Sequence, residues 1–387
     1  MNILLVSDMP FPRGSAFSSR LRSFVKLFCA CGHAVDLIVL KGEGASFREY
    51  DCCVHYVAPI SSILARCGIG ASKAYIAELS EILKEKHIDL IMSSRMPYCV
   101  AAIHKIAKKH NIPYVIEQCE WFDSTSFRLG RLHPYYRAHV RRIERENRKL
   151  DGVVAISRLF EEHYSNQGLK VIRIPTILDL AEIECRLDVP KKALPINLTF
   201  SGTLGHGKEN IEPMLRAVCA INESAERIHL HFYGPNRGEL EAALTADDSK
   251  ALLNSPYVHI HGKIPQEEVE AALRAADFSF IIRPQRRSSN AGFPTKLAES
   301  LSVGTPVIAN STGDIGLYLR NGENGFLTDD VSVAGLTALL QDAIDMTLNE
   351  REQMRKNARV TAERAFDYRV YASQMDSFLK DVCNGAD

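Results

Sequence analysis

The positions of apolar residues alternate along the chain between short continuous runs and longer stretches with helical spacing. Short apolar runs predict buried strands, and apolar residues three and four positions apart predict one buried face of a helix. In the first half, these patterns predict strands at 3–6, 35–40, 89–92, 114–116, 152–156 and 171–174, with helices from 20, at 100–109 and at 158–166. Such alternation predicts a parallel sheet with helices on its faces.

The second half of the chain repeats this alternation. It predicts strands at 198–200, 230–233, 258–261, 278–282 and 305–309, with helices from 211, at 239–244, at 269–275, from 294 and over most of 335–382. We therefore expect two α/β domains, at 1–180 and 190–365, separated by a linker rich in proline and charge within 175–195. A final helix within 366–387 could cross back to the first domain.

The composition is that of an ordinary globular protein. The 387 residues can bury two cores, and 46% of them are hydrophobic. The 47 basic and 47 acidic residues cancel, so no overall attraction to nucleic acid is expected. The 10 cysteines are scattered and lack the usual spacing of zinc ligands, which favours a reducing, cytoplasmic location.

Neither a secretion signal nor a membrane-spanning helix is predicted. The opening segment, MNILLVSDMP, lacks a basic segment before its apolar run, so we expect a strand there and no signal peptide. No apolar run approaches the roughly 20 residues that a membrane-spanning helix requires.

Candidate chemistry gathers in the stretch at 292–309, GFPTKLAESLSVGTPVIA. Gly292 can adopt any backbone angle before a short helix, which Gly304 is expected to end with a left-handed residue. The free N–H groups at such a helix start attract anions, and Lys296 adds a positive charge. Glu299, one turn later, could accept two hydrogen bonds from a sugar or ribose diol. The alternative is a plain helix–strand unit with an exposed Lys–Glu face.

A second candidate anion site follows the predicted strand at 198–200. The loop SGTLGHGK, at 201–208, has three glycines whose backbone could approach an anion closely. Gly202, Gly207 and Lys208 match the spacing of a Walker phosphate loop. However, Glu209 stands where a magnesium-binding Ser or Thr is required, which disfavours a nucleotide triphosphatase.

Two candidate ligand segments lie in the first half, where predicted strands end. Ligands of open parallel sheets bind beyond the carboxyl ends of the strands. The loop that contains Gly14 and leads to Arg20 is such a segment, with a plain polar connection as the alternative; it lacks the GxGxxG of dinucleotide sites. The other is EQCEWFD, at 117–123, where Trp121 could cover the apolar face of a sugar and Glu120 could bind its hydroxyls. Here the alternative is a tryptophan packed under a loop.

The segment from Arg137 to Lys149, RAHVRRIERENRK, is predicted to be a basic helix. It carries six Arg or Lys residues against two Glu. Such a helix could contact an anionic lipid surface or a diphosphate acceptor, which would make the protein peripheral at the inner face of a membrane. The alternative is a solvated helix face.

Several of these segments resemble one family. The segments GTLGHGKEN at 202–210, GFPTKLAESLSVGTPVIAN at 292–310 and RNGENGFL at 320–327 resemble the large family 4 of retaining glycosyltransferases. The segment ISRLFEEHYSNQGLKVIRIPTILD, at 156–179, is similar to the one that leads into the linker of that family. The resemblance implies the GT-B fold, in which two Rossmann-like domains with parallel sheets face each other across a cleft. It further implies that the C-terminal domain binds the nucleotide-sugar donor and the N-terminal domain binds the acceptor.

The resemblance also implies roles for individual residues. Gly202 and Lys208 match contacts to the donor diphosphate, and the loop at 292–295 matches the one that cradles phosphate and sugar. Glu299 matches the second acid of the family's Glu–seven–Glu motif, whereas the first acid would fall on Ala291 and is missing. With the candidates above, the expected donor site consists of Gly202, Thr203, Lys208, Arg283, Gly292, Phe293, Thr295, Lys296 and Glu299. The expected acceptor site consists of Gly14, Arg20, Glu120 and Trp121, and the expected catalytic residues are Lys208, Glu299 and Glu120.

The expected reaction is the transfer of a sugar, with retention, from a UDP- or GDP-linked donor to a hydroxyl of a saccharide or lipid-linked acceptor. Lys208 and Lys296 would stabilise the leaving diphosphate, and neither a cofactor nor a bound metal is expected. Because the GFPTK sequence also occurs in bacterial polysaccharide enzymes of this family, surface polysaccharide or glycolipid assembly is the expected setting. The alternatives are a GT-B sugar-nucleotide epimerase, a silent binding subunit, as Ala291 suggests, and a two-domain sugar-binding protein.

Overall fold

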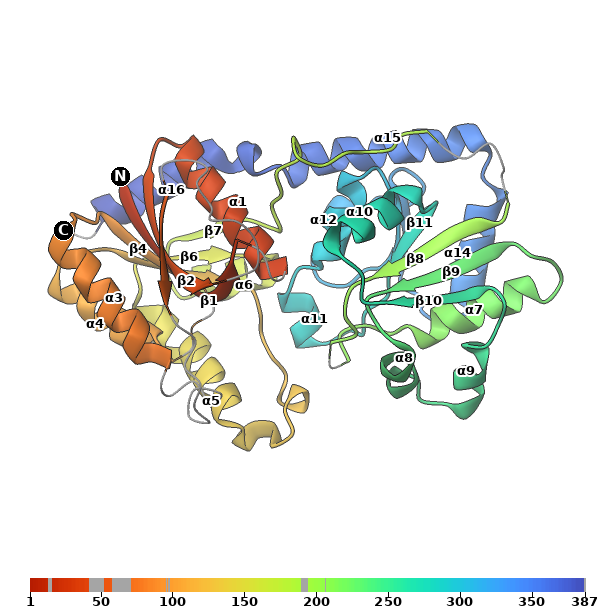
Figure 1. Ribbon diagram of the computed structural model, residues 1–387, viewed down its shortest axis with the longest axis horizontal. Helices are drawn as coiled ribbons and strands as arrows, with labels where there is room; N and C mark the ends of the chain where they lie inside the picture. Colours follow the sequence, from red (N-terminus) through yellow and green to blue (C-terminus); the bar gives the residue numbers. More distant parts are fainter. Residues whose placement is uncertain are drawn as a thin grey trace. The chain divides into compact units, whose positions relative to one another are not determined.

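The computed structural model describes residues 1–12, 16–41, 52–57, 71–94, 96, 98–188, 194–205 and 207–385 of the chain (Figure 1). Its backbone contacts define two compact units. The first consists of residues 1–178 and 367–387, and the second of residues 179–366. The last segment of the chain is thus part of the first unit.

The first unit is built on a seven-stranded sheet in which every neighbouring pair is parallel. The strand order is β3-β2-β1-β4-β5-β6-β7. The strands are β1 (Asn2–Phe11), β2 (Ala34–Lys41), β3 (Cys52–Val57), β4 (Leu90–Ser94), β5 (Tyr114–Gln118), β6 (Gly152–Ala155) and β7 (Val171–Arg173). The helices are α1 (Ala16–Ala30), α3 (Ala71–Glu85), α4 (Val100–Lys109), α5 (Pro134–Arg141), α6 (Arg158–Ser165) and α16 (Ala372–Asn384).

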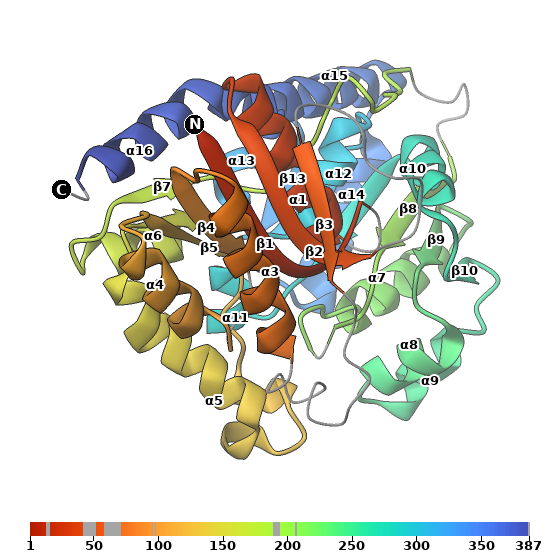
Figure 2. The same ribbon diagram turned by 60° about the vertical axis from the view of Figure 1, so that its left-hand side comes forward.

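Helices α1 and α16 cover the same face of the first sheet. Phe24 and Phe28 of α1 and Phe378 and Leu379 of α16 share one apolar cluster with alternate residues of the central strands. Figure 2 shows α3 and α4 on the opposite side of the sheet from α1 and α16. A side chain at Gly152 would meet Phe378 at 2.9 Å, so α16 packs directly on β6.

The second unit is built on a six-stranded parallel sheet of order β10-β9-β8-β11-β12-β13. Its strands are β8 (Ile196–Ser201), β9 (Ile228–Tyr233), β10 (Val258–Gly262), β11 (Phe278–Ile281), β12 (Val307–Asn310) and β13 (Gly325–Thr328). Its helices are α7 (Glu212–Asn222), α8 (Arg237–Ala243), α9 (Asp247–Leu252), α10 (Gln266–Ala275), α11 (Arg287–Ala291), α12 (Thr295–Ser302), α13 (Ile315–Tyr318), α14 (Val333–Asp345) and α15 (Leu348–Ala365).

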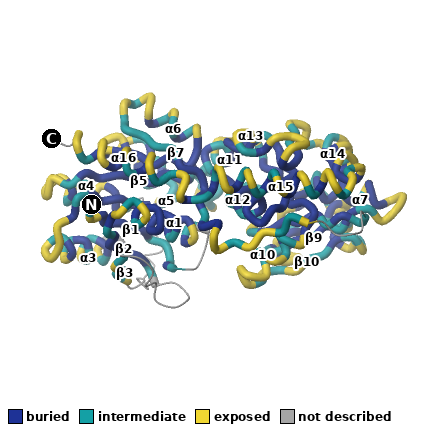
Figure 3. Tube along the Cα trace, turned by 90° about the horizontal axis from the view of Figure 1, so that it is seen from above, coloured by how far each residue is buried: buried dark blue, intermediate teal, exposed yellow. Residues whose placement is uncertain are grey.

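The two faces of the second sheet differ near its β10 edge. Ile228, Leu230 and Phe232 of β9 are buried in a core that includes α7 and α14. The alternate residues of β9 and most of β10 are only half-buried (Figure 3). The alternation of apolar and polar residues along β9, IHLHFY, accounts for this pattern, because successive side chains of a strand point to opposite faces.

Most predicted elements are confirmed, and the differences have local causes. Strand β1 extends to Phe11, through residues predicted to be loop, because it pairs with β2 as far as Lys41. Strand β3 was not predicted, since CCVHYV lacks an apolar run, and α3 was also missed. The prediction that Gly304 ends a helix is confirmed by its φ of +81°, and a Cβ there would lie 2.7 Å from Arg186 O.

Candidate functional site

The glycine loop after β8 forms close backbone and side-chain contacts at the carboxyl end of the second sheet. Gly202 has a φ of +115° and Gly234, which follows β9, has a φ of +109°. A Cβ on Gly234 would lie 2.3 Å from Gly202 O, and a Cβ on Gly202 would lie 2.7 Å from Lys296 Cε. Larger residues would therefore separate the β8 and β9 loops or displace Lys296.

Lys296 brings a positive charge to this loop from the first turn of α12. Its Nζ lies 3.0 Å from Glu209 Oε1 and 4.0 Å from the centre of the Phe200 ring. The Lys296 and Glu209 side chains are 13% and 9% exposed. Burial lowers the pKa of Lys296, while the charge of Glu209 opposes this shift. Lys296 is thus held between a carboxylate and an aromatic face, next to Gly202.

Glu209 is a candidate that the sequence interpretation missed. It was considered only as the residue that breaks the Walker pattern. In the structure, its Oε1 pairs with Lys296, and its Oε2 is a buried oxygen without a hydrogen-bond partner among the described residues. Because a buried oxygen usually has a donor, this atom indicates that a water or ligand hydroxyl can bind here. The sequence signal that could have identified Glu209 was its position directly after a glycine loop.

Glu299 lies one turn after Lys296 on α12 and is half-buried. Burial raises the pKa of its carboxyl group, Lys296 lowers it, and Glu270 raises it further. Thr295, at the start of α12, and Lys208 are also half-buried, whereas Thr203 is exposed. The structure therefore brings the predicted Gly202 and Lys296 together and leaves Glu299 accessible on the same helix.

Three other residues predicted to bind the donor have surroundings that explain a role in the fold. The Phe293 ring is 7% exposed and packs against Tyr318 and Phe366, with ring centres 5.5 and 5.7 Å away, so its side chain is a core residue. Gly292 has an extended backbone with φ of −89°, an angle that does not require glycine. Arg283 is 5% exposed and donates from Nη1 to Ser289 O at 3.2 Å, while its backbone N–H donates to Asn310 Oδ1 at 2.9 Å.

Ala291 stands where the family motif would place its first acid. It is fully buried at the end of α11. Any side chain larger than alanine at this position would have to fit into a fully packed environment.

In the first unit, Arg20 is a buried structural residue and not an exposed acceptor contact. Its side chain is 3% exposed, and it forms an ion pair with Glu117 of β5. It also donates to the carbonyl oxygens of Pro175 and, at 2.9 Å, of Ile174. Arg20 thus joins α1 to β5 and to the segment after β7. Gly14, predicted beside it, lies outside the described residues.

Trp121 is also packed against protein, which contradicts the expectation that its ring covers a sugar. The indole is 6% exposed and stacks on Phe160 at 5.6 Å with an interplanar angle of 7°. His163 contacts it edge-on at 4.9 Å. The alternative reading, a tryptophan packed under a loop, is the correct one.

Glu120 is half-buried and lines a small pocket beyond the carboxyl end of β5, together with Glu117, Tyr135 and Arg142. The pocket volume is about 10 Å³, which is close to the space that one water molecule needs. Arg142 is 3% exposed, and its Nε and Nη1 have no hydrogen-bond partner among the described residues. The pocket therefore contains hydrogen-bond donors of Arg142. The sequence did not indicate them, because Arg142 lies in the segment predicted to be a basic helix and only the structure shows that its side chain is buried.

The segment from Arg137 to Lys149 is helical but irregular, with a π-helix at Arg142–Glu146. Several of its exposed bases are paired with its own acids: Arg141 with Glu146 at 3.0 Å and Arg148 with Glu144 at 3.2 Å. These pairs reduce the charge available to an anionic surface. Contact with a membrane remains a prediction.

The structure brings together a cluster of possible metal ligands that the sequence interpretation did not identify. His229 and His231 of β9 and His259 of β10 bring one ligand nitrogen each to within 4.8 Å of one another. The signal was present as two H-x-H pairs, HLH and HIH, in strands that were both predicted. It was missed because only cysteine spacing was considered.

The class of this protein follows from its fold and from two family matches. Two units built on parallel sheets with flanking helices are the architecture of the GT-B fold. Residues 189–361 match the family model described as glycosyl transferases group 1. Residues 18–182 match the model described as Glycosyltransferase Family 4. Together, the fold and the two matches show that the chain is a glycosyltransferase of the GT-B fold.

Solved structures of similar fold agree with this class. The chain superposes on sucrose-phosphate synthase from Thermosynechococcus elongatus with a TM-score of 0.77 and 15% identity, covering 99% of both chains. It superposes on HepE of Anabaena in complex with UDP-glucose with a TM-score of 0.69 and 16% identity, covering 98% of this chain and 100% of that one. At such identities, the similarity concerns the fold.

One curated relative matches over a short segment. Trehalose phosphorylase of Pleurotus pulmonarius is 34% identical over 105 residues. The match covers 24% of this chain and 14% of that protein.

Among the described residues, no helix combines the length and the apolar character needed to cross a membrane.

Proposed function

We propose that the protein transfers a sugar from a nucleoside-diphosphate sugar to an acceptor hydroxyl with retention of configuration. The observation that carries this proposal is the position of Lys296, against Gly202 at the carboxyl end of β8 and 3.0 Å from Glu209. A glycine loop beside a helix start and a lysine suits a diphosphate, because backbone N–H groups and the charge attract the same anion.

The proposed chemistry requires mainly stabilisation of the leaving group. The bond between the anomeric carbon and the diphosphate oxygen breaks, and the acceptor oxygen forms its bond on the same face of the sugar. The acceptor proton passes to an oxygen of the leaving phosphate. Lys296 and Lys208 stabilise the negative charge that grows on the diphosphate, and such interactions accelerate the reaction because they strengthen in the transition state. Glu299 accepts hydrogen bonds from a donor diol.

The donor is proposed to be UDP- or GDP-linked, and the acceptor a saccharide or a lipid-linked saccharide in surface polysaccharide or glycolipid assembly. The UDP-glucose complex of HepE, a protein of the same fold, supports the choice of donor class. Within the first unit, Glu120 is the proposed acceptor contact, because it is half-buried just beyond the carboxyl end of β5. We further propose a cytoplasmic location, no cofactor, and peripheral membrane contact through the segment from Arg137 to Lys149.

The test is incubation of the full chain with a panel of UDP- and GDP-sugars, after thermal-shift screening of UDP, GDP and their sugars. Because a ligand that binds only the native state stabilises it by mass action, the melting temperature should rise for one nucleotide family. Release of the free nucleotide and transfer to water or to an acceptor support the proposal, and the anomeric configuration of the product by NMR tests retention. Formation of an isomeric nucleotide sugar would instead indicate an epimerase. Binding without any turnover would indicate the silent subunit or the sugar-binding protein.

A further inference from the structure

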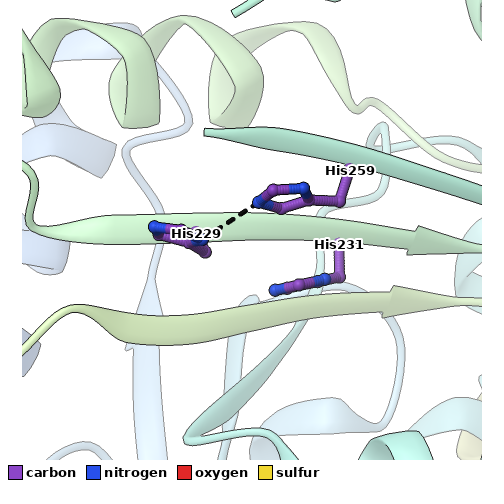
Figure 4. A group of neighbouring side chains, drawn as sticks. All are labelled: His229, His231 and His259. Carbon is purple, nitrogen blue, oxygen red and sulfur yellow. Dashed lines mark hydrogen bonds between the residues drawn. The ribbon is translucent and has the colours of Figure 1, made fainter. Parts of the chain in front are cut away.

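Four histidines lie on neighbouring strands of the second sheet. His229 and His231 are two residues apart on β9, and His259 and His261 are two residues apart on β10. The parallel register places His259 opposite His231. Because residues two apart on a strand point to the same face, all four rings lie on one side of the sheet. Figure 4 shows three of these rings beside one another.

From these positions we infer that His229, His231 and His259 form a binding site for a transition-metal ion of the zinc type. One ligand nitrogen from each ring lies within 4.8 Å of the other two, and His259 Nε2 is 2.9 Å from His229 Nδ1. Zinc–nitrogen bonds of about 2.0–2.1 Å place the nitrogens of a tetrahedral ion about 3.4 Å apart. The rings are now stacked at interplanar angles of 22–28°, so binding requires the side chains to rotate until the three lone pairs face one ion.

The surroundings orient one ligand nitrogen in the way that metal-binding histidines require. Glu226 Oε1 lies 2.7 Å from His229 Nε2. A carboxylate can only accept here, so Nε2 carries the proton and Nδ1, which faces His259, keeps its lone pair. Carboxylates that hold the second nitrogen of a ligating histidine in this way are typical of zinc sites.

All three histidines are half-buried, so they lie at the surface of the sheet and not in its core. The His229 side chain is 24% exposed, so an ion can reach the site from solvent.

A fourth histidine lies next to the three proposed ligands. His261 Nε2 lies 3.1 Å from His231 Nδ1, so His261 or a water can complete the coordination. Imidazole ligands favour zinc, copper and nickel over magnesium and calcium. The bound ion would join β10, the edge strand, to β9. This inference concerns a structural site and does not depend on the proposed sugar transfer.

A second group, Asp36, Cys53 and His55 in the first unit, has a similar size but weaker support. Its Asp36 is already paired with Lys86 at 2.6 Å and with His55 at 2.9 Å. The two groups can be distinguished, because Cys53 would bring a thiolate to the metal and the histidine site would not.

The alternative role of the cluster is a stack of neutral rings. Tyr233 and His261 stack at 4.1 Å, and His231 and His259 at 4.7 Å. A variant that keeps a flat ring but removes the ligand nitrogens separates the two roles. His259→Phe is such a variant, and His110→Phe, at an exposed position of the first unit, is its control.

The experiment is a Co²⁺ and Zn²⁺ titration of the full chain, without an affinity tag and after treatment with a chelator. We expect one Co²⁺ per chain with visible d–d bands and no thiolate charge-transfer band. His259→Phe should bind Co²⁺ at least about 100-fold more weakly, since even changes of outer-shell partners cost about 10–100-fold. Glu226→Gln should weaken binding about tenfold, and His110→Phe should bind normally. Zn²⁺ should raise the melting temperature of the wild type and of His110→Phe, but not of His259→Phe.

The metal-free melting temperature of His259→Phe shows whether the variant folds. Absence of saturable binding by the wild type would overturn the inference. So would unchanged binding by His259→Phe, or a thiolate charge-transfer band, which would assign the metal to the group around Cys53. If His259→Phe does not fold, the same comparison is made with His231→Gln, which also lacks an imidazole.

Discussion

The carboxyl ends of the two sheets carry charged residues in contrasting states. In the first unit, Arg20 and Glu117 are both 3% exposed and form an ion pair with each other. In the second, Lys296 is 13% exposed, and its partner Glu209 keeps one oxygen without a hydrogen-bond partner among the described residues. The same strand–helix alternation thus builds one end where both charged groups pair fully inside the fold and another where a paired carboxylate keeps one oxygen without a hydrogen-bond partner among the described residues.

Glycines account for part of this difference. In the second unit, Gly202 and Gly234 allow the loops after β8 and β9 to approach each other and Lys296. In the first unit, the segment after β5 contains Trp121, which stacks on Phe160. A loop without side chains leaves backbone groups open to an anion, whereas a loop with a tryptophan forms its own core.

The largest effect is expected for Arg20→Ala. The change leaves Glu117 as a buried carboxylate without its partner and removes donors from two carbonyl groups. Breaking a buried pair in this way typically costs about 3–5 kcal/mol of the free energy of unfolding. Urea unfolding followed by the fluorescence of Trp121, the single tryptophan, reports directly on the first unit.

If Arg20 were an acceptor contact, the Arg20→Ala variant would keep the free energy of unfolding of the wild type and lose only activity toward the acceptor. That result would contradict the comparison of the two sheets. The matched control is Arg22→Ala, two residues along the same helix and half-buried. We expect a much smaller loss of stability in that variant.

The next effect in size is expected for Lys296→Met, which removes the charge but keeps an apolar chain over Phe200. Because negative charge grows on the diphosphate as the sugar leaves, turnover should fall by more than nucleotide affinity. Loss of one such group typically costs about 10²–10³ in kcat. Lys208→Ala should follow the same pattern. Steady-state kinetics and calorimetric binding of the nucleotide separate the two quantities.

Lys263→Met, at an exposed position of the same unit, is the control for these lysine variants and should keep full activity. Normal turnover in both Lys296→Met and Lys208→Ala would remove the donor site proposed for the second unit.

The sequence was sufficient to predict the alternation of elements, both parallel sheets and the class of protein. It was insufficient wherever function depended on burial. Arg20, Trp121 and Phe293 are residue types that bind ligands when exposed, and nothing in their local spacing shows that their side chains are buried. The pairing of Glu209 with Lys296 joins residues 87 positions apart, so it depends on the packing of α12 against the β8 loop.

The failure to predict β3 and the histidine cluster of β9 and β10 has a related cause. CCVHYV in β3 mixes polar and apolar residues without a clear run, so only its pairing with β2 identifies it as a strand. The histidines of β9 and β10 are visible as H-x-H pairs, but their proximity follows from the register of two strands about 30 residues apart.

A smaller effect is expected for Glu299→Gln, which keeps the shape of the side chain and removes its charge. Loss of a charge-assisted hydrogen bond to a diol costs about 1.5–3 kcal/mol, or about tenfold to a hundredfold in affinity. The loss should appear with the free nucleotide if the diol belongs to ribose, and only with the complete donor if it belongs to the sugar. Since Glu299 is half-buried, the melting temperature without ligand should change little. Unchanged affinity for both nucleotide and donor would exclude the diol contact.

The smallest expected effect is the pH dependence of stability that arises from His231 in the second sheet. Burial, together with the neighbouring His259, His261 and His229, lowers the pKa of His231 from the ordinary value of 6.5 to about 4. Asn197 is the other polar group at its ring, and Glu226 acts only through His229. Between about pH 6.5 and pH 4, the unfolded chain binds a proton at this position that the native protein does not bind. The stability that His231 contributes is therefore complete above pH 6.5 and is lost as the pH falls toward 4.

The measurement is urea unfolding of the wild type and of His231→Asn at pH 7, 6 and 5 in the presence of a chelator. Carboxylates titrate in both proteins, so their contribution cancels in the difference between the two. Because the site is partly exposed to solvent, we expect the wild type to lose about 1 kcal/mol more than the variant between pH 7 and pH 5. Circular dichroism should detect this loss, while the transition followed by Trp121 fluorescence should shift less, since Trp121 belongs to the first unit. Equal pH dependence in the wild type and the variant would show that the histidine cluster is not held in its neutral form.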